Sequence, residues 1–513
     1  MPGVAFNNMP GDIRVPLFYA EVNAGVPPYA GTSRLLLMGR KLAGGSAQIG
    51  VPRNLGSADP NALFGVGSML ALQAAAARWH NPVGEIWVLP VADPAGTAAS
   101  GTIAISGTAT AAGTLVRYIA GERVQVAVAA GDTAAVVGAA LAAAVGKGFT
   151  KYGRTLAHPV TAAHATGTVT LTARHVGTEG NSIRVEAGLD GDEVDPPGLT
   201  VTIASATLTG GTGDVDMATA LAALGAEPFD WIAAPYASTA QLDAVRSFLS
   251  DSGAGRWSPT VGLDGHYITY LNGNLATLTA FGAGRNDRHV TIKGGLNSPS
   301  APWLHAAIDG AITAFSKNLG RSITEAVEIA RPLHTLVKQG VRPPKAASDQ
   351  WKLADRDSLY RNGIAADVVR ADGQVAIDRM VTTYQSNDWG QADITFLDVE
   401  TLAIAAYVKR YLKTRITSLY PRHVLKDENP RNMQGIVTPN QIRAAIIHAY
   451  RELFDAGLVE KPDLFAQYLI VERSGDPNRV NAYLPVDVAN QFRVFAANIT
   501  IFPELNDQIA ALQ

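Results

Sequence analysis

The pattern of residues changes twice along this sequence, and that change most constrains its fold. Short apolar runs at 34–39 and 85–90 are typical of buried strands, and residues 61–79 between them have helical spacing with many alanines. From about residue 95 to 213 the chain instead becomes rich in Gly, Thr, Ala and Val. The first pattern returns at Asp214. We therefore expect a β-rich domain inserted into an α/β domain.

The inserted block is predicted to consist of strands and one helix. Residues 102–106, 123–128 and 168–172 alternate as half-buried strands do. An Ala-rich helix is expected from 134 to 145, with the Asp-Thr pair at 132–133 as its N-cap.

Two capping boxes predict helix starts outside that block. Ser238 is followed three residues later by Gln241, and Thr438 by Gln441. Pro439 occupies the first position of the second helix, where a missing amide hydrogen costs nothing. Both helices are therefore expected to begin at defined residues.

The length of 513 residues exceeds what one hydrophobic core usually serves, and ~150 residues per domain suggests about three domains. Prolines within the first 30 residues and little periodicity are typical of an extended arm. Paired prolines near 341–345 favour an extended link and a second boundary. The predicted division is an arm at 1–30, an α/β core domain at 31–94 and 214–345, an inserted β-rich surface domain at 95–213, and a C-terminal domain at 346–513.

The composition argues against several classes of protein. Hydrophobic residues make up 47% and charged residues 17%, a weakly charged surface that suits a protein buried among neighbours, although an Ala-rich proteome gives the same composition. A net charge of -3 predicts no nucleic-acid binding. The absence of cysteine excludes disulfides and thiolate metal sites and fits folding in the cytosol. We expect no secretory signal and no membrane insertion, because no apolar run reaches the ~18 residues needed to span a bilayer.

The usual catalytic and cofactor motifs are missing. Gly146 and Lys147 lack the glycine spacing and the Ser or Thr of a phosphate-binding loop, and are expected to end a helix. None of the ten histidines forms a His-Glu-x-x-His motif or a pair at i,i+4 spacing. We expect no cofactor and no metal, although a metal site built from residues distant in sequence stays open.

One short motif resembles a catalytic loop. Gly-Thr-Ser at 31–33 also occurs around the nucleophile of subtilisin-type proteases, where the chain order is Asp, His, Ser. Ser33 is preceded by Asp12 but by no histidine. We interpret this segment as a turn into a strand, and Asp264-Gly-His266 as a loop between strands. We expect no catalytic residue.

Short segments without catalytic residues are spread along nearly the whole chain. They are FGVGSML at 64–70, YIAGERVQVAVAAGDT at 118–133, LTAR at 171–174, GTEGNSIR at 177–184, YPRH at 420–423, DAGLVE at 455–460, DPNR at 476–479 and NQFRVFA at 490–496. In this order and spacing they resemble the contractile tail sheath family of Mu-like bacteriophages. No segment carries chemistry, so the specificity of the resemblance lies in their order and spacing.

The resemblance implies a structural protein of the virion tail. Such subunits stack as six-fold rings around a tail tube, are assembled in an extended state in the host cytoplasm, and contract once to drive the tube through the cell envelope for genome ejection. The implied partners are further copies of the chain, the tail tube protein, and baseplate and tail terminator proteins. The implied fold class is α/β, with a subtilisin-like core without a triad, an inserted β-rich domain and an α+β C-terminal domain that faces the tube.

Both termini are candidates for strands exchanged between subunits, because exchanged strands hold subunits together while they slide. At the C-terminus Phe495, Ala497, Ile499 and Ile501 lie on one side of an alternating pattern. The alternative is a strand in the subunit's own sheet. At the N-terminus the alternating residues are Ile13, Val15, Leu17 and Tyr19, and Pro16 would confine that strand to a sheet edge.

Basic residues on one predicted helix are candidates for the surface that faces the tube. The helix at 399–419 carries Lys409, Arg410, Lys413 and Arg415. The alternative is that they complement the negative end of the helix dipole. Because no nucleotide loop is found, the energy for contraction would have to be stored in the extended lattice.

Two other functions stay open at this point. An α/β hydrolase needs an ordered triad, and an Ala/Gly/Thr-rich surface adhesin needs an export signal. Neither feature is found in the sequence.

Overall fold

The computed structural model describes residues 33–318, 326–499 and 501. The chain divides into two compact units. The larger contains 32–318, 328–405 and 488–513, and the smaller contains 1–31, 319–327 and 406–487. The predicted N-terminal arm, with Ile13, Val15, Leu17 and Tyr19, lies outside the described residues.

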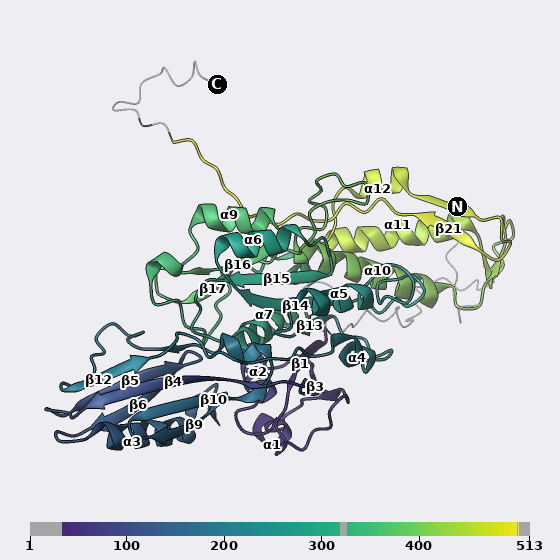
Figure 1. The fold of residues 1–513 in the computed structure, drawn as a ribbon. Coiled ribbons are helices and arrows are strands. Elements are labelled where there is room, and N and C mark those ends of the chain that lie inside the picture. The colour runs from purple at the N-terminus through teal and green to yellow at the C-terminus, as the bar shows by residue number, and fades with distance from the viewer. Residues whose placement is uncertain (1–32, 319–325, 500, 502–513) are drawn as a thin grey trace, which may run out of the picture. The chain divides into compact units, whose positions relative to one another are not determined.

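The larger unit is built on an eight-stranded sheet in the order β17-β16-β15-β14-β13-β1-β3-β2 (Figure 1). The strands from β16 to β3 are parallel neighbours, and β17 and β2 are antiparallel strands at the two edges. The chain order reverses at β1, which is the arrangement of a doubly wound sheet. The strands are β1 (Leu35–Arg40), β2 (Arg53–Asn54), β3 (Ile86–Val91), β13 (Trp231–Ala233), β14 (His266–Asn272), β15 (Val290–Gly295), β16 (Ile364–Val369) and β17 (Val375–Arg379).

Both faces of this sheet are buried, and β1 shows why the sequence requires it. Leu35 and Leu37 belong to one apolar cluster, whereas Leu36 and Met38 belong to another. Because alternate side chains of a strand point to opposite faces, a continuous apolar run needs cover on both sides.

Helices provide that cover. Residues of α2 and α7 share the cluster of Leu35, and residues of α4, α5, α6 and α9 share the cluster of Leu36. The helices are α1 (Pro60–Phe64), α2 (Met69–His80), α4 (Met217–Ala222), α5 (Thr239–Phe248), α6 (Leu275–Ala283), α7 (Pro302–Ser316), α8 (Val327–Ala330) and α9 (Leu353–Arg361).

The segment between β3 and α4 forms two antiparallel sheets with one helix, which Figure 1 draws in purple and blue. One sheet has the order β12-β4-β10-β9, the other β11-β5-β6, and β7 and β8 form a hairpin. The elements are β4 (Ala98–Gly107), β5 (Gly113–Ile119), β6 (Glu122–Val128), α3 (Ala134–Lys147), β7 (Phe149–Lys151), β8 (Arg154–Leu156), β9 (Val160–Ala165), β10 (Thr168–Val176), β11 (Val185–Glu186) and β12 (Leu199–Ile203).

The inserted segment is fixed to the carboxyl end of β1 by a buried ion pair. Arg40 is 1% exposed, and its Nη2 lies 2.8 Å from Oε2 of Glu179. Its Nη1 donates to the carbonyl of Val176. Both terminal nitrogens of the guanidinium are thereby paired inside the larger unit.

The smaller unit consists of helices and short strand pairs. Tyr450 and Phe465 stack with ring centroids 3.6 Å apart, and Ile446, Ala449 and Leu453 are buried beside them. Its elements are α10 (Val399–Leu419), which begins in the larger unit, β18 (Val424–Leu425), β19 (Ile436–Val437), α11 (Pro439–Asp455), α12 (Pro462–Tyr468), β20 (Ile470–Arg473) and β21 (Val480–Tyr483).

Most predicted elements are found, and three details are corrected. Both capping boxes form as predicted. The helix expected at 61–79 is two helices, because Gly67 between them has φ +78 and a Cβ there would lie 2.8 Å from the His158 carbonyl. The Asp-Thr pair at 132–133 makes no side-chain cap bond to α3. The boundary expected near 341–345 is wrong, because β16 and β17 complete the large sheet and the division falls after Ala405.

Candidate functional site

The C-terminal segment exposes apolar side chains. The structure gives residues 489–499 and 501 no helix and no strand pairing. Phe495 is 80% exposed, Ile499 81% and Ile501 86%, and Phe492 and Val494 are similarly exposed. Ala497 is exposed as well. Removing apolar side chains from water is favourable, and nothing in the described part of this chain covers the side chains of this segment.

One residue of that segment behaves differently, and sequence reasoning missed it. Arg493 is 15% exposed, and its Nη2 lies 3.1 Å from Asp398 Oδ1 and 3.0 Å from Glu400 Oε2. Glu400 is fully buried and also accepts a hydrogen bond of 2.9 Å from the Leu333 amide. The available signal was that Arg493 is the one charged residue between positions 492 and 501.

The four basic residues predicted to face the tube lie in the middle of α10. Lys409 and Lys413 are exposed, and Arg410 is half-buried. Arg415 instead lies 3.5 Å from a carboxylate oxygen of Glu452 on α11. The last turn of α10 contains no basic residue, so the helix dipole, whose influence ends within that turn, does not account for them.

A cluster of buried charges joins β15, α7 and β16. Lys293 Nζ lies 3.0 Å from Asp309 Oδ1 and 2.6 Å from Asp367 Oδ1. Lys338 Nζ lies 2.7 Å from Asp309 Oδ2 and 2.8 Å from Asp367 Oδ2. It also donates to His305 Nδ1 at 2.9 Å. Two ammonium groups thus face two carboxylates, with a neutral imidazole beside them.

The surroundings fix the charges of this cluster. Burial opposes ionisation of Asp367, but Lys293 and Lys338 outweigh it and lower the pKa of Asp367. Burial, followed by the Lys338 charge, lowers the pKa of His305 to about 4. Ligand atoms of His305, Asp309 and Asp367 lie within 4.8 Å of one another, as in a metal site. The two lysines already neutralise both carboxylates, so this donor set does not fit a metal ion.

Sequence reasoning missed the cluster, although two signals for it exist. Lys293 interrupts the apolar run of β15, and Asp309 lies among apolar residues of α7. A charge within a buried element indicates a buried partner. The partners themselves come from elements far along the chain.

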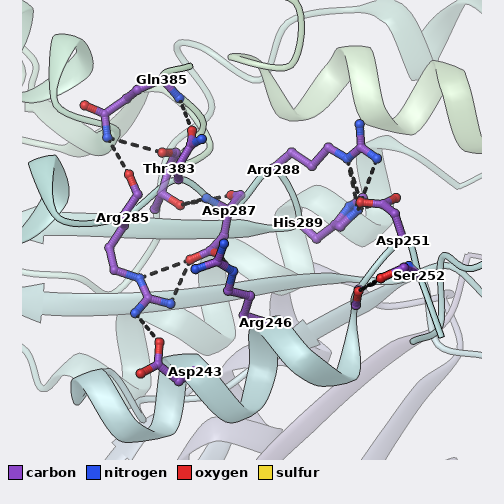
Figure 2. A network of polar contacts seen from close by, with 12 residues as sticks. Asp243, Arg246, Asp251, Ser252, Arg285, Asp287, Arg288, His289, Thr383 and Gln385 are labelled. Carbon is purple, nitrogen blue, oxygen red and sulfur yellow. Dashed lines mark hydrogen bonds and ion pairs between the residues drawn. The ribbon is translucent and has the colours of Figure 1, made fainter. Parts of the chain in front are cut away.

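A second polar network lies at the amino end of β15 (Figure 2). Arg285 donates to Asp287 at 2.7 Å and to Asp243 on α5 at 2.7 Å. The Asp287 amide donates to Thr383 Oγ1 at 2.8 Å. Gln385 Nε2 donates to the Arg285 carbonyl at 2.7 Å. The network therefore holds the segment that leads from β17 to α10 against the sheet.

A neighbouring group of contacts holds a buried imidazole (Figure 2). Asp251 lies 2.6 Å from Arg288 Nη2 and 3.1 Å from His289 Nε2. The Trp257 ring stacks on His289 with centroids 4.4 Å apart. Burial is the largest influence on His289 and lowers its pKa despite Asp251. These contacts are structural, because the charged groups of Arg288 and Asp251 are paired with each other and the imidazole is held by Asp251 and the Trp257 ring.

A cleft of about 990 Å³ opens at the carboxyl ends of β13, β14 and β15, where doubly wound sheets often bind ligands. The helix starts that line it are already capped by their own side chains. Ser238 accepts from the Gln241 amide of α5, and Asn274 accepts from the Thr277 amide of α6 at 2.8 Å. The amides that would bind an anion are therefore partly used.

Ser33 is the one described residue of the segment that resembles a protease loop, and it is buried. Ser33 is 3% exposed, and its hydroxyl accepts a hydrogen bond of 2.8 Å from the Trp231 indole. His266 Nε2 instead lies 2.8 Å from Thr291 Oγ1. Ser33 thus accepts a hydrogen bond from Trp231 as part of the packing at the start of β1 and β13.

Within the described part of the chain, no helix combines the length and apolar character needed to cross a bilayer.

Comparison with known proteins gives two family matches in chain order. Residues 210–383 match the phage tail sheath protein central domain, and residues 391–502 match the phage tail sheath C-terminal domain. The Mu-like prophage FluMu tail sheath protein of Haemophilus influenzae is 36% identical over 502 residues, which cover 96% of this chain and 98% of that protein.

Solved structures of sheath proteins are more distantly similar. A sheath tail protein from Desulfitobacterium hafniense has a TM-score of 0.47 and 13% identity, covering 92% of this chain and 97% of that one. The sheath of the anti-feeding prophage in its contracted state has a TM-score of 0.44 and 12% identity, covering 96% and 100%. At these scores the structures add nothing to the assignment, which rests on sequence.

The sequence relationship extends over both described units, and the matched domains include strands β13 to β17 of the large sheet, α10 and the C-terminal segment. The chain therefore belongs to the phage tail sheath protein family and groups with the sheath proteins of Mu-like phages.

Proposed function

We propose that this chain is the repeating subunit of a contractile tail sheath, which stacks as six-fold rings around a tail tube and contracts to drive the tube through the host envelope. The observation that carries the proposal is the C-terminal segment of a sheath-family chain, whose large apolar side chains are exposed without a partner. Exposed apolar surface of this kind is typical of a contact that another molecule completes.

The C-terminal segment supplies a strand to a neighbouring subunit. Residues Phe495, Ala497, Ile499 and Ile501 form one side of that strand. The β20–β21 hairpin of the neighbour is a suitable acceptor, because Ile470 and Tyr483 are 53% and 62% exposed and a two-stranded hairpin is marginally stable alone. The N-terminal residues Ile13, Val15, Leu17 and Tyr19 supply a second strand to a sheet edge.

The basic middle of α10 faces the tail tube. Exposed Lys409 and Lys413, one turn apart, carry this contact, and Arg410 and Arg415 contribute beside them. A tube surface with acidic groups is the complementary partner. The inserted segment at 95–213 forms an outer surface domain, and the ends of the sheath contact baseplate and terminator proteins.

The subunit works without catalysis. Its parallel core corresponds to the subtilisin-like core of sheath proteins, with Ser33 used in packing. The buried charge cluster and the Arg285 network keep the larger unit of each subunit rigid, so that contraction moves this unit as one body. The free energy of contraction is stored in the extended lattice, which is assembled in the host cytoplasm as part of the virion tail.

The test is electron microscopy of the purified full-length chain with no nucleotide added. Rings or hollow tubes are expected, because assembly needs only complementary surfaces. Tubes should also form with the Lys147→Met variant, whose side chain is exposed at the end of α3. A protein that stays monomeric at high concentration would contradict the proposal.

A further inference from the structure

The C-terminal segment reverses the usual distribution of side chains. Between Phe492 and Ile501 the large apolar side chains are 74% to 86% exposed, whereas the one charged side chain, Arg493, is 15% exposed. A guanidinium is seldom buried unless carboxylates or other acceptors pair with it. Arg493 therefore marks a specific attachment of an otherwise unattached segment.

The attachment site is built from charges that need Arg493. Glu400 has no exposed surface, and its two oxygens are used by the Leu333 amide and by Arg493. Asp398 is held by Arg379 through two hydrogen bonds of 2.8 Å and by Arg493 at 3.1 Å. Two guanidinium groups thus balance two carboxylates. Withdrawal of Arg493 would leave Glu400 buried with less compensation.

The attachment site lies at a position in the fold that favours negative groups. Asp398 and Glu400 lie at the start of α10, where the helix dipole favours negative groups. Burial lowers the pKa of Lys317 to about 8, and the Glu400 charge opposes this shift. Arg493 is the side chain that pairs directly with Asp398 and Glu400 from the C-terminal segment.

We propose that Arg493 is the anchor of the C-terminal segment: residues up to 493 stay with their own subunit, and the part that reaches a neighbour begins at Val494. The second clause rests on the strand exchange proposed above, whereas the anchor itself does not. A pull on the exchanged strand would act at Asp398 and Glu400, at the start of the helix that carries the basic residues.

The test is limited chymotrypsin digestion of unassembled full-length subunits. Cleavage after Phe495 serves as an internal reference, since this residue is exposed beyond the anchor. Cleavage after Phe492, next to the anchor, should be at least about tenfold slower than after Phe495 in the unchanged protein, and Arg493→Gln should bring the two rates together. The matched control, Arg361→Gln, removes an exposed ion pair with Asp357 and should change neither rate.

Synthetic peptides of residues 488–501, with Arg or Gln at position 493, give the intrinsic rate at which chymotrypsin cleaves each bond, and the rates in the protein are divided by these values. Cleavage after buried Phe465 reports unfolding. If Arg493→Gln unfolds the subunit, trypsin digestion of the unchanged protein decides: the bond after Arg493 should be cut at least about tenfold slower than the bond after exposed Arg431. Equal rates at Phe492 and Phe495, or at Arg493 and Arg431, would overturn the anchor.

These digestions require no assembly, so they separate the anchor from the strand exchange. If the anchor is found but subunits lacking residues 494–513 still form normal tubes, the strand exchange is wrong and the anchor stands. If digestion shows no anchor but the truncated subunits fail to assemble, the exchanged segment begins before Arg493.

Discussion

The buried charge cluster and the C-terminal segment are opposite exceptions to the rule that apolar groups are buried and charges exposed. In the cluster, Lys293, Lys338, Asp309 and Asp367 are removed from water, and every charge finds its opposite within one chain. In the segment, phenylalanine and isoleucine side chains remain in water. The first exception is complete in a single subunit, whereas the second requires another molecule.

The comparison separates stability from assembly. Removing one partner of a buried ion pair destabilises the fold, because the other charge stays buried without compensation. Such pairs contribute nothing to contacts outside the subunit. Exposed apolar side chains contribute little to the fold and gain free energy when a neighbour covers them. Substitutions in the two regions should therefore affect different measurements.

The largest expected effect is on assembly. Removal of residues 494–513 should abolish tubes while leaving the melting temperature of the subunit nearly unchanged, because intersubunit hydrogen bonds worth ~0.5 to 1.5 kcal/mol each are lost without any loss to the core. Electron microscopy and thermal denaturation measure the two results. Removal of 491–513 also deletes Arg493, and should lower the melting temperature as well. A large loss of stability on the shorter truncation would place the strand in the subunit's own sheet.

The next largest effect is on the fold. Lys338→Met should destabilise the subunit by about 3 to 5 kcal/mol, because Asp309 and Asp367 would share one remaining ammonium group. Chemical denaturation measures the change, with Lys147→Met as the exposed control. An effect as small as that of the control would mean that the cluster tolerates an unpaired carboxylate. It would contradict the view that the cluster determines stability whereas the C-terminal segment determines assembly.

Acid should weaken the core but not alter the C-terminal segment. Burial lowers the pKa of His305 to about 4 and that of His266 to about 3, whereas unfolded histidine titrates near ~6.5. Between those values the unfolded chain binds more protons, so stability is full above pH ~6.5 and falls as the pH decreases, by about 1.4 kcal/mol per pH unit for each histidine.

Melting temperatures between pH 7 and 5 measure this slope. His305→Gln should flatten it, and His164→Gln, at an exposed site, should not. The protein lacking 494–513 should follow the unchanged protein. If the truncation changed how the melting temperature depends on pH, the buried core and the C-terminal segment would not be independent. Asp367, whose pKa is lowered, contributes stability that is lost only at lower pH.

A solvated lysine should have a smaller effect than a buried one. Lys413→Glu on α10 is expected to weaken binding to the tail tube several-fold and to leave the melting temperature unchanged, because its charge is exposed. Co-sedimentation with tube at two salt concentrations measures this, since salt screens such contacts over ~8 Å. Lys147→Glu is the control. Equal binding by both variants would remove α10 from the tube contact.

The smallest effect is expected at Ser33. Ser33→Ala should leave assembly unchanged and cost roughly 1 to 2 kcal/mol, because the Trp231 indole loses its buried acceptor. No peptidase activity should be detectable before or after the change. Activity that disappears in the variant would overturn the packing role of Ser33.

Local patterns determined much of this fold. The apolar run at 34–39 lies in β1, the alternation at 123–128 in β6, and the helix expected at 399–419 is α10. The capping box at Thr438 and Gln441 forms because its partners are three residues apart. These features depend on neighbours in sequence, so the sequence determined them by itself, and ordered motifs also indicated the family.

Only the tertiary structure decided which distant residues meet. Lys338 and Asp309 are 29 residues apart, and Arg493 and Glu400 are 93 apart, so no periodicity connects them. The division after Ala405 was equally hidden, because β16 and β17 follow the prolines that predicted a boundary yet pair with β15. Buried charges choose partners by position in the folded chain, and that position is fixed only when the sheet and its helices have packed.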